Sequence, residues 1–384
     1  MKNLWDDKEA KAYKTDLEMR VYTSNLLGRS DELVLHGGGN TSVKTTVDGE
    51  DILLVKGSGW DLVSIKAEGF APVKMKTLLE MAELKKLSDS DMVSGQKAAM
   101  IDPTAPNPSV EAILHAIIPF KVVDHTHADA IVTISNSKQG KEHIAKLFPN
   151  FLIVPYIMPG FILASKINEM IQGLDWSKCE GMILHNHGIF TFDDDAKKSY
   201  DKMIDAVTLA EEFLEKNASL DLNDADAEAK DFDISLLEID KFMHVNQTPL
   251  ALHYASQENL RTAVTRGVLT PEHIIRTKRV PLVVEDSDVE EALKHFKVGY
   301  ETYFNAYKED ETMLDSNPKY AVIKDFGVVS FGKTQKEADV INDVVSHTMM
   351  AVLRADKLGG YQSISIADSF DMEYWELEQA KLKK

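Results

Sequence analysis

Two His-x-His motifs are the residues in this sequence whose types and spacing best suit metal chemistry. His125 and His127 end one apolar stretch, and His185 and His187 end another. Side chains of a strand alternate between its faces, so the outer residues of such a motif point the same way. In the second motif we favour His187, because Gly188 after it lets the backbone turn tightly beside an ion. We therefore predict that His125, His127 and His187 bind Zn²⁺ or another divalent metal ion, leaving a coordination position open for Lewis-acid chemistry.

A carboxylate at a predicted helix start is the candidate catalytic residue. Glu111 lies in the first turn of a helix that we expect over residues 109–118, and His115 follows four residues later on the same face. An acidic residue in that position can simply stabilise the helix dipole. Beside a metal ion it can also bind the ion in the resting state and then act as a general base. We assign Glu111 this catalytic role and expect His115 to pack or hydrogen-bond behind the ligands.

Two glycine-containing loops are candidates for binding a phosphate group. They are Gly37-Gly38-Gly39-Asn40-Thr41-Ser42 and Gly57-Ser58-Gly59. Backbone amides and hydroxyl groups bind oxyanions without a full positive charge. Neither loop matches a Walker motif or the dinucleotide fingerprint. Lys56, just before the second loop, offers a metal-free alternative, since a desolvated lysine can form a Schiff base with a carbonyl substrate. It can equally bind an anion or reach solvent.

Composition excludes several classes of partner. The 384 residues carry a formal charge of -19 and no basic cluster, so we expect no nucleic-acid partner. No run approaches 18 apolar residues and the first residues lack an apolar signal core, so we expect no membrane partner and a cytoplasmic location. The single cysteine, Cys179, excludes an internal disulfide and leaves His and carboxylate side chains as the metal ligands.

Hydrophobic periodicity predicts alternating helices and strands, and therefore an α/β protein. The expected helices lie at 16–27, 72–84, 109–118, from 140, from 162, 194–215, 255–266, 289–307 and 335–355. The expected strands lie at 51–56, 121–124, 152–154, 181–184, 189–192, 280–284 and within 320–331. Between 217 and 233 the sequence is acidic and poor in large apolar residues. We predict a catalytic domain at 1–217, an acidic linker at 218–234 and a smaller α/β domain at 235–384 that lacks the metal ligands.

One stretch of the first domain has an echo in the second. Residues 182–192, MILHNHGIFTF, resemble residues 321–331, AVIKDFGVVSF, and a long helix is expected after each. The alignment puts Phe326 where His187 stands. A degenerate duplication would make the second domain a scaffold or an oligomer surface. A strand, a glycine turn, a strand and a helix can also recur by chance.

Six motifs taken in order resemble the class II aldolase/adducin family over about the first 215 residues. They are GGNTS at 38–42, KGSG at 56–59, PSVE at 108–111, HTH at 125–127, PYIMPG at 155–160 and NHG at 186–188. The longer pattern, with KGSGWDL at 56–62 and the tail FDMEYWELEQAK at 370–381, looks like the aldolase portion of bifunctional rhamnulose-1-phosphate aldolase/short-chain dehydrogenase proteins. No Gly-x-x-x-Gly-x-Gly segment occurs, so we expect this chain to lack the oxidoreductase half.

The resemblance implies a fold, an activity and a set of site residues. The fold would be an α/β/α domain with a central, mostly antiparallel sheet, followed by a second, smaller α/β domain. Zinc on the three histidines and Glu111 as acid/base would cleave a ketose 1-phosphate, rhamnulose 1-phosphate or a similar sugar, to dihydroxyacetone phosphate and an aldehyde. The family's phosphate-binding positions fall on Gly39, Asn40, Ser58, Gly59 and Ser109.

Other readings share the same motifs. A metal-dependent epimerase, dehydratase or decarboxylase of a sugar or sugar-acid phosphate would use the same ligands. Family epimerases carry Asp where Glu111 stands, which favours cleavage here. An adducin-like module without chemistry would have no use for the histidines and the carboxylate. Relatives are commonly tetramers, so we expect a homo-oligomer.

Overall fold

The computed structural model describes residues 1–222, 229–286 and 288–380, and it divides into two compact units. Unit 1 comprises Met1–Ile131 and Lys141–Glu212, and unit 2 comprises Val132–Gly140 and Phe213–Lys384. Residues 223–228 of the predicted linker lie outside the described residues. No helix in the described part of the chain is long and apolar enough to cross a membrane.

Unit 1 contains a seven-stranded sheet in the order β3-β2-β1-β4-β7-β6-β5. Every neighbouring pair is antiparallel except β5 and β6, which are parallel. The predicted α/β fold with a central, mostly antiparallel sheet is thus confirmed. The strands are β1 (Asn40–Val47), β2 (Glu50–Lys56), β3 (Phe70–Lys74), β4 (Val122–Thr126), β5 (Phe151–Val154), β6 (Gly181–Leu184) and β7 (Gly188–Asp193).

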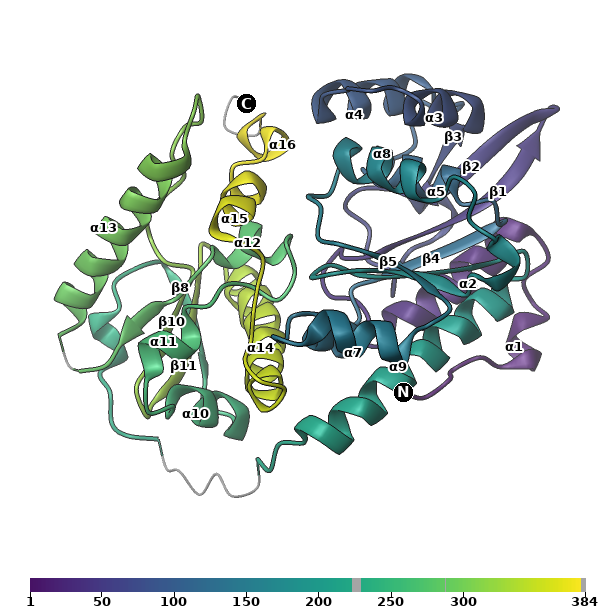
Figure 1. Cartoon of the computed structure of the whole chain (residues 1–384). Coiled ribbons are helices and arrows are strands. Elements are labelled where there is room, and N and C mark those ends of the chain that lie inside the picture. Colours follow the sequence, from purple (N-terminus) through teal and green to yellow (C-terminus); the bar gives the residue numbers. More distant parts are fainter. Residues whose placement is uncertain (223–228, 287, 381–384) are drawn as a thin grey trace. The chain divides into compact units, whose positions relative to one another are not determined.

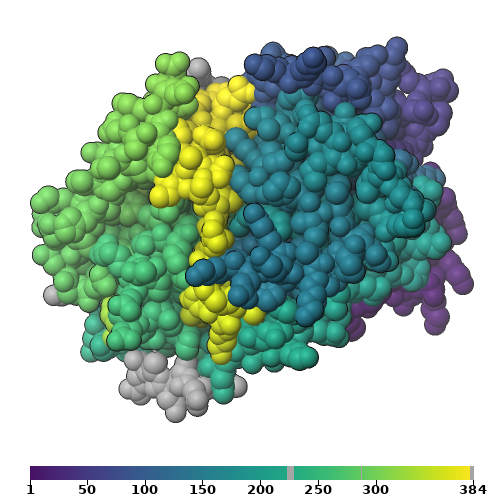
Figure 2. Space-filling view, viewed as in Figure 1, coloured from purple at the N-terminus to yellow at the C-terminus, as the bar shows by residue number. Residues whose placement is uncertain are grey.

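Helices cover both faces of this sheet (Figure 1). Helices α3, α4, α5 and α8 lie over one face, and α2 and α9 lie over the other. The helices before residue 219 are α1 (Asp7–Ala10), α2 (Asp16–Gly28), α3 (Met75–Ala82), α4 (Asp89–Ala98), α5 (Ala112–Ile117), α6 (Asp129–Ser135), α7 (Gly140–Leu147), α8 (Phe161–Met170) and α9 (Ala196–Ala218). Short 3₁₀ turns occupy Ala67–Gly69 and Trp176–Lys178. In Figure 2, side chains fill the visible face of unit 1, and the purple N-terminal residues lie at its edge.

Register assigns the polar residues of the central strands to the two faces. Residues directly opposite each other in an antiparallel pair share a face. Asn40 pairs with His125, which pairs with Phe190, so this row lies on one face. Thr41 pairs with Asp124, which pairs with Thr191, so the next row lies on the other. Both rows are buried, as expected for central strands covered on both faces.

Unit 2 has a four-stranded sheet in the order β8-β11-β10-β9. Strands β9 and β10 are parallel, and the other neighbouring pairs are antiparallel. Its strands are β8 (Phe242–Asn246), β9 (Leu282–Val284), β10 (Tyr320–Ile323) and β11 (Gly327–Gly332). Its helices are α10 (Pro249–Ala255), α11 (Leu260–Val264), α12 (His273–Thr277), α13 (Val289–Tyr307), α14 (Gln335–Lys357), α15 (Ile366–Glu373) and α16 (Glu376–Gln379), with a 3₁₀ turn at Ile234–Leu236.

Three predicted elements differ from the structure. The helix expected over 72–84 begins at Met75, because the residues before it form β3 against β2. The helix expected over 109–118 begins at Ala112, which makes Glu111 its N-cap residue instead of a first-turn residue. The helix expected over 255–266 is only partly helical: Ala255 is the last residue of α10, and α11 occupies Leu260–Val264. Strand β1 was not expected, although its Thr and Val residues have high strand propensity.

Candidate metal and carboxylate site

Three imidazoles meet at one end of the sheet of unit 1. His125 is the penultimate residue of β4, His127 follows that strand, and His187 lies in the turn between β6 and β7. One nitrogen of each ring lies within 4.8 Å of the others. His125 and His187 are buried and His127 is half-buried. The alternation of β4 brings the first two rings to one face, and the β6–β7 hairpin brings the third.

Hydrogen bonding fixes which nitrogen of His125 faces this group. Its Nδ1 lies 3.0 Å from the carbonyl oxygen of Ile189. A carbonyl oxygen can only accept, so Nδ1 carries the proton and donates. The Nε2 of a neutral ring then holds a lone pair, and it lies 3.0 Å from Nε2 of His127. A backbone carbonyl that orients a ring in this way is typical of a histidine that ligates metal.

Gly188 leaves room for the histidine rings. A Cβ atom on Gly188 would lie 2.3 Å from the carbonyl oxygen of Thr126 and 3.1 Å from the rings of His125 and His127. The sequence suggested that this glycine is needed for a tight turn. Instead, Asn186 carries the positive φ of the turn, 59°, and Gly188 is needed because β4 approaches so closely.

Glu111 faces the imidazoles from the start of α5. Its backbone, with φ -88° and ψ 10°, lies in the sparsely populated bridge region that many active-site residues occupy. Its Oε2 is 3.5 Å from Nε2 of His125, and its Oε1 is 3.7 Å from Nε2 of His187. Oε1 is buried and has no hydrogen-bond partner in the described part of the chain. Asn40 Nδ2 donates a 2.6 Å hydrogen bond to Oε2.

Two of the residues predicted to bind phosphate, Asn40 and Ser109, are hydrogen-bonded to Glu111. Gly39, with φ +61°, precedes Asn40, and a Cβ on it would lie 2.6 Å from the carbonyl oxygen of His125. The loops of Ser58 and Ser109 are joined to each other, since Ser58 N donates to the Asn107 carbonyl and Ser109 N donates to the Lys56 carbonyl. The Oγ of Ser109 also accepts a hydrogen bond of 3.3 Å from Glu111 N.

The exposure of these loops differs. Ser58 and Gly59 are exposed, Ser109 is half-buried, and Gly39 and Asn40 are buried. The side-chain amide of Asn40 is engaged at both ends, with Glu111 and with His115. Phosphate binding by these five residues remains a prediction.

Lys56 lies beside the first glycine loop. Its Nζ donates a hydrogen bond of 3.0 Å to the Gly37 carbonyl, and the side chain is buried. Burial lowers the pKa of Lys56 to about 8, although the negative charges of Asp61 and Glu111 act in the opposite direction. A lysine of this pKa has a substantial neutral fraction near pH 8 and is chemically capable of attack on a carbonyl.

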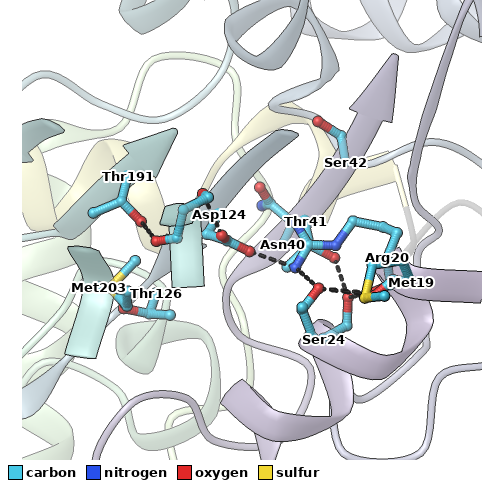
Figure 3. Close-up of polar contacts among 12 residues, drawn as sticks. Met19, Arg20, Ser24, Asn40, Thr41, Ser42, Asp124, Thr126, Thr191 and Met203 are labelled. Carbon is cyan, nitrogen blue, oxygen red and sulfur yellow. Dashed lines mark hydrogen bonds and ion pairs between the residues drawn. The ribbon is translucent and has the colours of Figure 1, made fainter. Parts of the chain in front are cut away.

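A buried ion pair on the opposite face of β4 was not expected from the sequence (Figure 3). Arg20 of α2 lies with Nη2 2.6 Å from Oδ1 of Asp124, and both side chains are fully buried. Ser199 Oγ donates a hydrogen bond of 2.5 Å to Oδ2 of Asp124, and Arg20 Nη2 donates to Thr23 Oγ1. The ion pair connects α2 to β4, and the Ser199 hydrogen bond connects α9 to the same strand, which also carries His125. The available signal was Asp124 itself, because a carboxylate inside an apolar strand requires a buried partner.

The residues of this site fit a divalent metal ion. Three imidazoles and a carboxylate are the donor set that Zn²⁺ and similar ions prefer. Glu111 Oε1 is a buried oxygen without a hydrogen-bond partner among the described residues, and a cation would satisfy it. Lys56 and Arg20 are engaged elsewhere, by the Gly37 carbonyl and by Asp124. The histidines and Glu111 would therefore hold the ion.

Two protein families match consecutive parts of this chain. The family described as class II aldolase and adducin N-terminal domain matches residues 19–214. A second family, described as aldolase class II, second domain, matches residues 230–382. Members of the first family generally use a divalent metal.

Individual relatives are similar in sequence, in structure or in both. An uncharacterized oxidoreductase, YuxG, of Bacillus subtilis is 29% identical over 419 residues. That alignment covers 100% of this chain, and the chain spans 60% of the length of that relative. The solved N-terminal class II aldolase domain of a conserved protein from Thermoplasma acidophilum is 40% identical, with a TM-score of 0.52, and covers 56% of this chain and 99% of its own. An L-fuculose-1-phosphate aldolase from Thermus thermophilus is 15% identical, with a TM-score of 0.35, and covers 52% of this chain and 95% of its own.

Proposed function

Because the chain belongs to the class II aldolase and adducin family, we propose that unit 1 is a divalent-metal-dependent lyase. The substrate would be a ketose 1-phosphate similar to rhamnulose 1-phosphate, and the products dihydroxyacetone phosphate and an aldehyde. The observation that carries this proposal is the group of three imidazoles beside Glu111, whose buried Oε1 has no hydrogen-bond partner among the described residues. We take zinc as the metal and a homo-oligomer as the working assembly.

Glu111 is assigned the proton transfers. A metal ion at this site would polarise the substrate carbonyl as a Lewis acid. Cleavage removes the proton from the hydroxyl group on the carbon that becomes the aldehyde, and the carbon–carbon bond then breaks. The electron pair stays on the phosphate-bearing fragment, which finally takes up one proton on carbon. Glu111 would help to hold the ion at rest. When substrate frees Oε1 from the ion, that oxygen is suited to accept the first proton and return the second, because no hydrogen bond within the described chain occupies it.

The glycine and serine loops are assigned to the substrate phosphate. Backbone amides near Gly39 and Gly59, with the hydroxyl groups of Ser58 and Ser109, would bind its oxygens. Asn40 completes the predicted set, although both ends of its side-chain amide already have partners. Binding the phosphate holds the sugar carbonyl in a fixed position relative to Glu111.

Two alternatives have support in the same residues. An epimerase, dehydratase or decarboxylase would use the same histidines, although glutamate at position 111 favours cleavage. A Schiff-base mechanism on Lys56 is the metal-free alternative, and its support is the burial that lowers the pKa of this lysine to about 8. Borohydride reduction in the presence of substrate would trap a Schiff base as a stable adduct on Lys56 and would leave a metal-dependent enzyme unmodified.

The test is product analysis by NMR with a panel of ketose 1-phosphates. We expect dihydroxyacetone phosphate and an aldehyde in equal amounts, and we expect Glu111→Gln to lower kcat by roughly 100-fold or more. A Glu212→Gln variant in α9 is a control that removes a glutamate charge away from the site. A metal-loaded protein that converts the sugar without forming a three-carbon phosphate ester would overturn the lyase assignment.

A further inference from the structure

A series of buried hydrogen bonds leads from β1 to the candidate catalytic carboxylate. Ser42 Oγ lies 2.7 Å from His115 Nδ1. His115 Nε2 is hydrogen-bonded to Asn40 Oδ1, and Asn40 Nδ2 donates to Glu111 Oε2. All four side chains are buried.

The register of β1 and the spacing in α5 create this series. Asn40 and Ser42 are two residues apart on β1, so they share a face, and Asn40 lies directly opposite His125. Glu111 and His115 are four residues apart at the start of α5, so they also share a face. The two pairs contact each other, because Asn40 hydrogen-bonds to both Glu111 and His115, and Ser42 hydrogen-bonds to His115.

The chemistry of the four groups fixes the direction of every hydrogen bond. An ionised carboxylate can only accept, so Asn40 must turn its NH₂ group toward Glu111 and its Oδ1 toward His115. His115 must then carry its proton on Nε2. Nδ1 of the neutral ring becomes an acceptor, and Ser42 donates to it. The His115 ring is fully buried, and burial disfavours its charged form.

This arrangement makes the two oxygens of Glu111 different. Oε2 is bound by Asn40, whereas Oε1 has no hydrogen-bond partner in the described chain and lies 3.7 Å from His187 Nε2. We propose that Ser42, His115 and Asn40 are positioning residues that hold Glu111 with Oε1 toward the substrate. The inference rests on the proposed function for the role of Glu111, but the hydrogen-bond directions stand without it.

Loss of the proton on Nε2 of His115 would exchange donors and acceptors along this series of hydrogen bonds. Asn40 Oδ1 would then face a lone pair, and the amide would turn over to recover a hydrogen bond. Its oxygen would face Glu111 Oε2, and two acceptors at that distance repel each other. Glu111 would leave its position or take up a proton, and in either case it would be a poorer general base for the substrate.

The first experiment measures the tautomer and needs no activity. Nitrogen-15 NMR of the metal-free full chain reports which ring nitrogen carries the proton, and the His115→Gln variant identifies the signal of this residue. We expect the Nε2–H tautomer at neutral pH. The Nδ1–H tautomer, or a doubly protonated ring, would overturn the proposal.

The second experiment separates positioning from general damage to the fold. In His115→Gln, the side-chain amide can still donate toward Asn40, whereas His115→Leu cannot. We expect the Leu variant to lower kcat by about 100-fold with little change in KM, and the Gln variant to recover at least about tenfold of that loss. Ser42→Ala should lower kcat less than His115→Leu does, because it removes the group that favours the tautomer and leaves the ring in place.

Equal kcat in the Gln and Leu variants, or a loss confined to KM, would contradict a positioning role. Metal content, measured in each variant, should stay unchanged. If the wild-type protein has no lyase activity, the proposed function fails, whereas the tautomer measurement still decides whether the hydrogen-bond series exists as described.

Discussion

The two units of this protein contain the same four-stranded arrangement, but among the described residues only unit 1 has a cluster of three histidines. The order β4-β7-β6-β5 in unit 1 corresponds to β8-β11-β10-β9 in unit 2, with the parallel pair in the same place. The hairpin turns match as well, because Asn186 and Asp325 both have φ 59°. A 23-residue helix follows each hairpin, α9 in one case and α14 in the other.

Strand register identifies the equivalent residues. Thr126 pairs with Ile189, and Asn246 pairs with Val328. His125 and His127 therefore correspond to Val245 and Gln247, and His187 corresponds to Phe326. A Cβ on Gly327 would lie 2.5 Å from the Asn246 carbonyl oxygen, the same approach that Gly188 makes to Thr126. This agreement supports the degenerate duplication that the sequence suggested.

The surroundings of the equivalent strands explain why one supports a polar site. Strand β4 is central, with β1 beside it and α5 above its histidines, whereas β8 is an edge strand of the described sheet. Asp124 on β4 has a fully buried partner, but its equivalent His244 forms a half-exposed pair with Asp339. Strand β4 and the β6–β7 hairpin therefore supply the histidines, while strand β1 and helix α5 of unit 1 supply Asn40, Ser42 and Glu111.

The largest expected effect on stability comes from removing the negative charge of Asp124, the buried partner of Arg20. Asp124→Asn leaves Arg20 as an uncompensated buried charge, and we expect a loss of about 3–5 kcal/mol in the free energy of unfolding. The matched variant Asp339→Asn breaks a half-exposed pair and should cost far less, because solvent screens such a pair. Chemical denaturation measures both. Similar losses in the two variants would mean that burial does not distinguish these strands.

The two equivalent glycines provide a second comparison. Gly188→Ala pushes a methyl group against Thr126 and both β4 histidines, so we expect metal affinity to fall by roughly 10- to 100-fold. Gly327→Ala should destabilise unit 2, because Gly327 has φ +135° and an equally close neighbour, without changing metal affinity. Isothermal titration with Zn²⁺ checks both variants. Unchanged affinity in Gly188→Ala would contradict the ligand assignment.

A smaller effect, shared by both units, depends on pH. Burial lowers the pKa of Lys56 in unit 1 and of Lys278 in unit 2 to about 8. Between pH 8 and the usual lysine value of 10.5 the unfolded chain binds more protons than the folded chain, so stability rises with pH in that window. Below pH 8 both states are protonated, and the cost of burying the charge is fully present.

We expect each lysine to contribute a rise of roughly 1–2 kcal/mol in the free energy of unfolding between pH 8 and 9.5. Lys56→Met and Lys278→Met should each flatten that rise, as measured by denaturation at the two pH values. An exposed lysine, Lys86, changed to Met is the control and should leave the slope unchanged. A slope that neither buried substitution alters would show that these lysines titrate normally in the folded protein.

Local patterns predicted much of the fold. Helix α13 begins and ends where periodicity placed it, at Val289 and Tyr307, and the β6–β7 hairpin follows from two apolar runs around a glycine. The alternation of side chains along β4 was enough to bring His125 and His127 to one face. His187, in the turn of the β6–β7 hairpin, was predicted from the same kind of local pattern, a His-x-His motif after an apolar run.

Contacts between segments far apart in the chain could not be predicted from a single sequence. Asn40 and Glu111 are 71 residues apart, and nothing local to either marks them as partners. The Arg20 and Asp124 pair depends on the packing of α2 against the far face of β4, which no helical period specifies. Glu111 is the N-cap residue because α5 begins only after the loop that precedes it. The residue after β2, Gly57, pairs with Pro108 of that loop, and this long-range contact could not be read from the local sequence.

The metal content of the purified full chain is the most direct test of the three-histidine site. Elemental analysis would compare the wild-type protein with His187→Ala and with the matched variant Phe326→Ala in unit 2. We predict about one divalent ion per chain in the wild type and in Phe326→Ala, and almost none in His187→Ala. Absence of metal from the wild type even after incubation with Zn²⁺, or full retention by His187→Ala, would contradict metal binding by His125, His127 and His187.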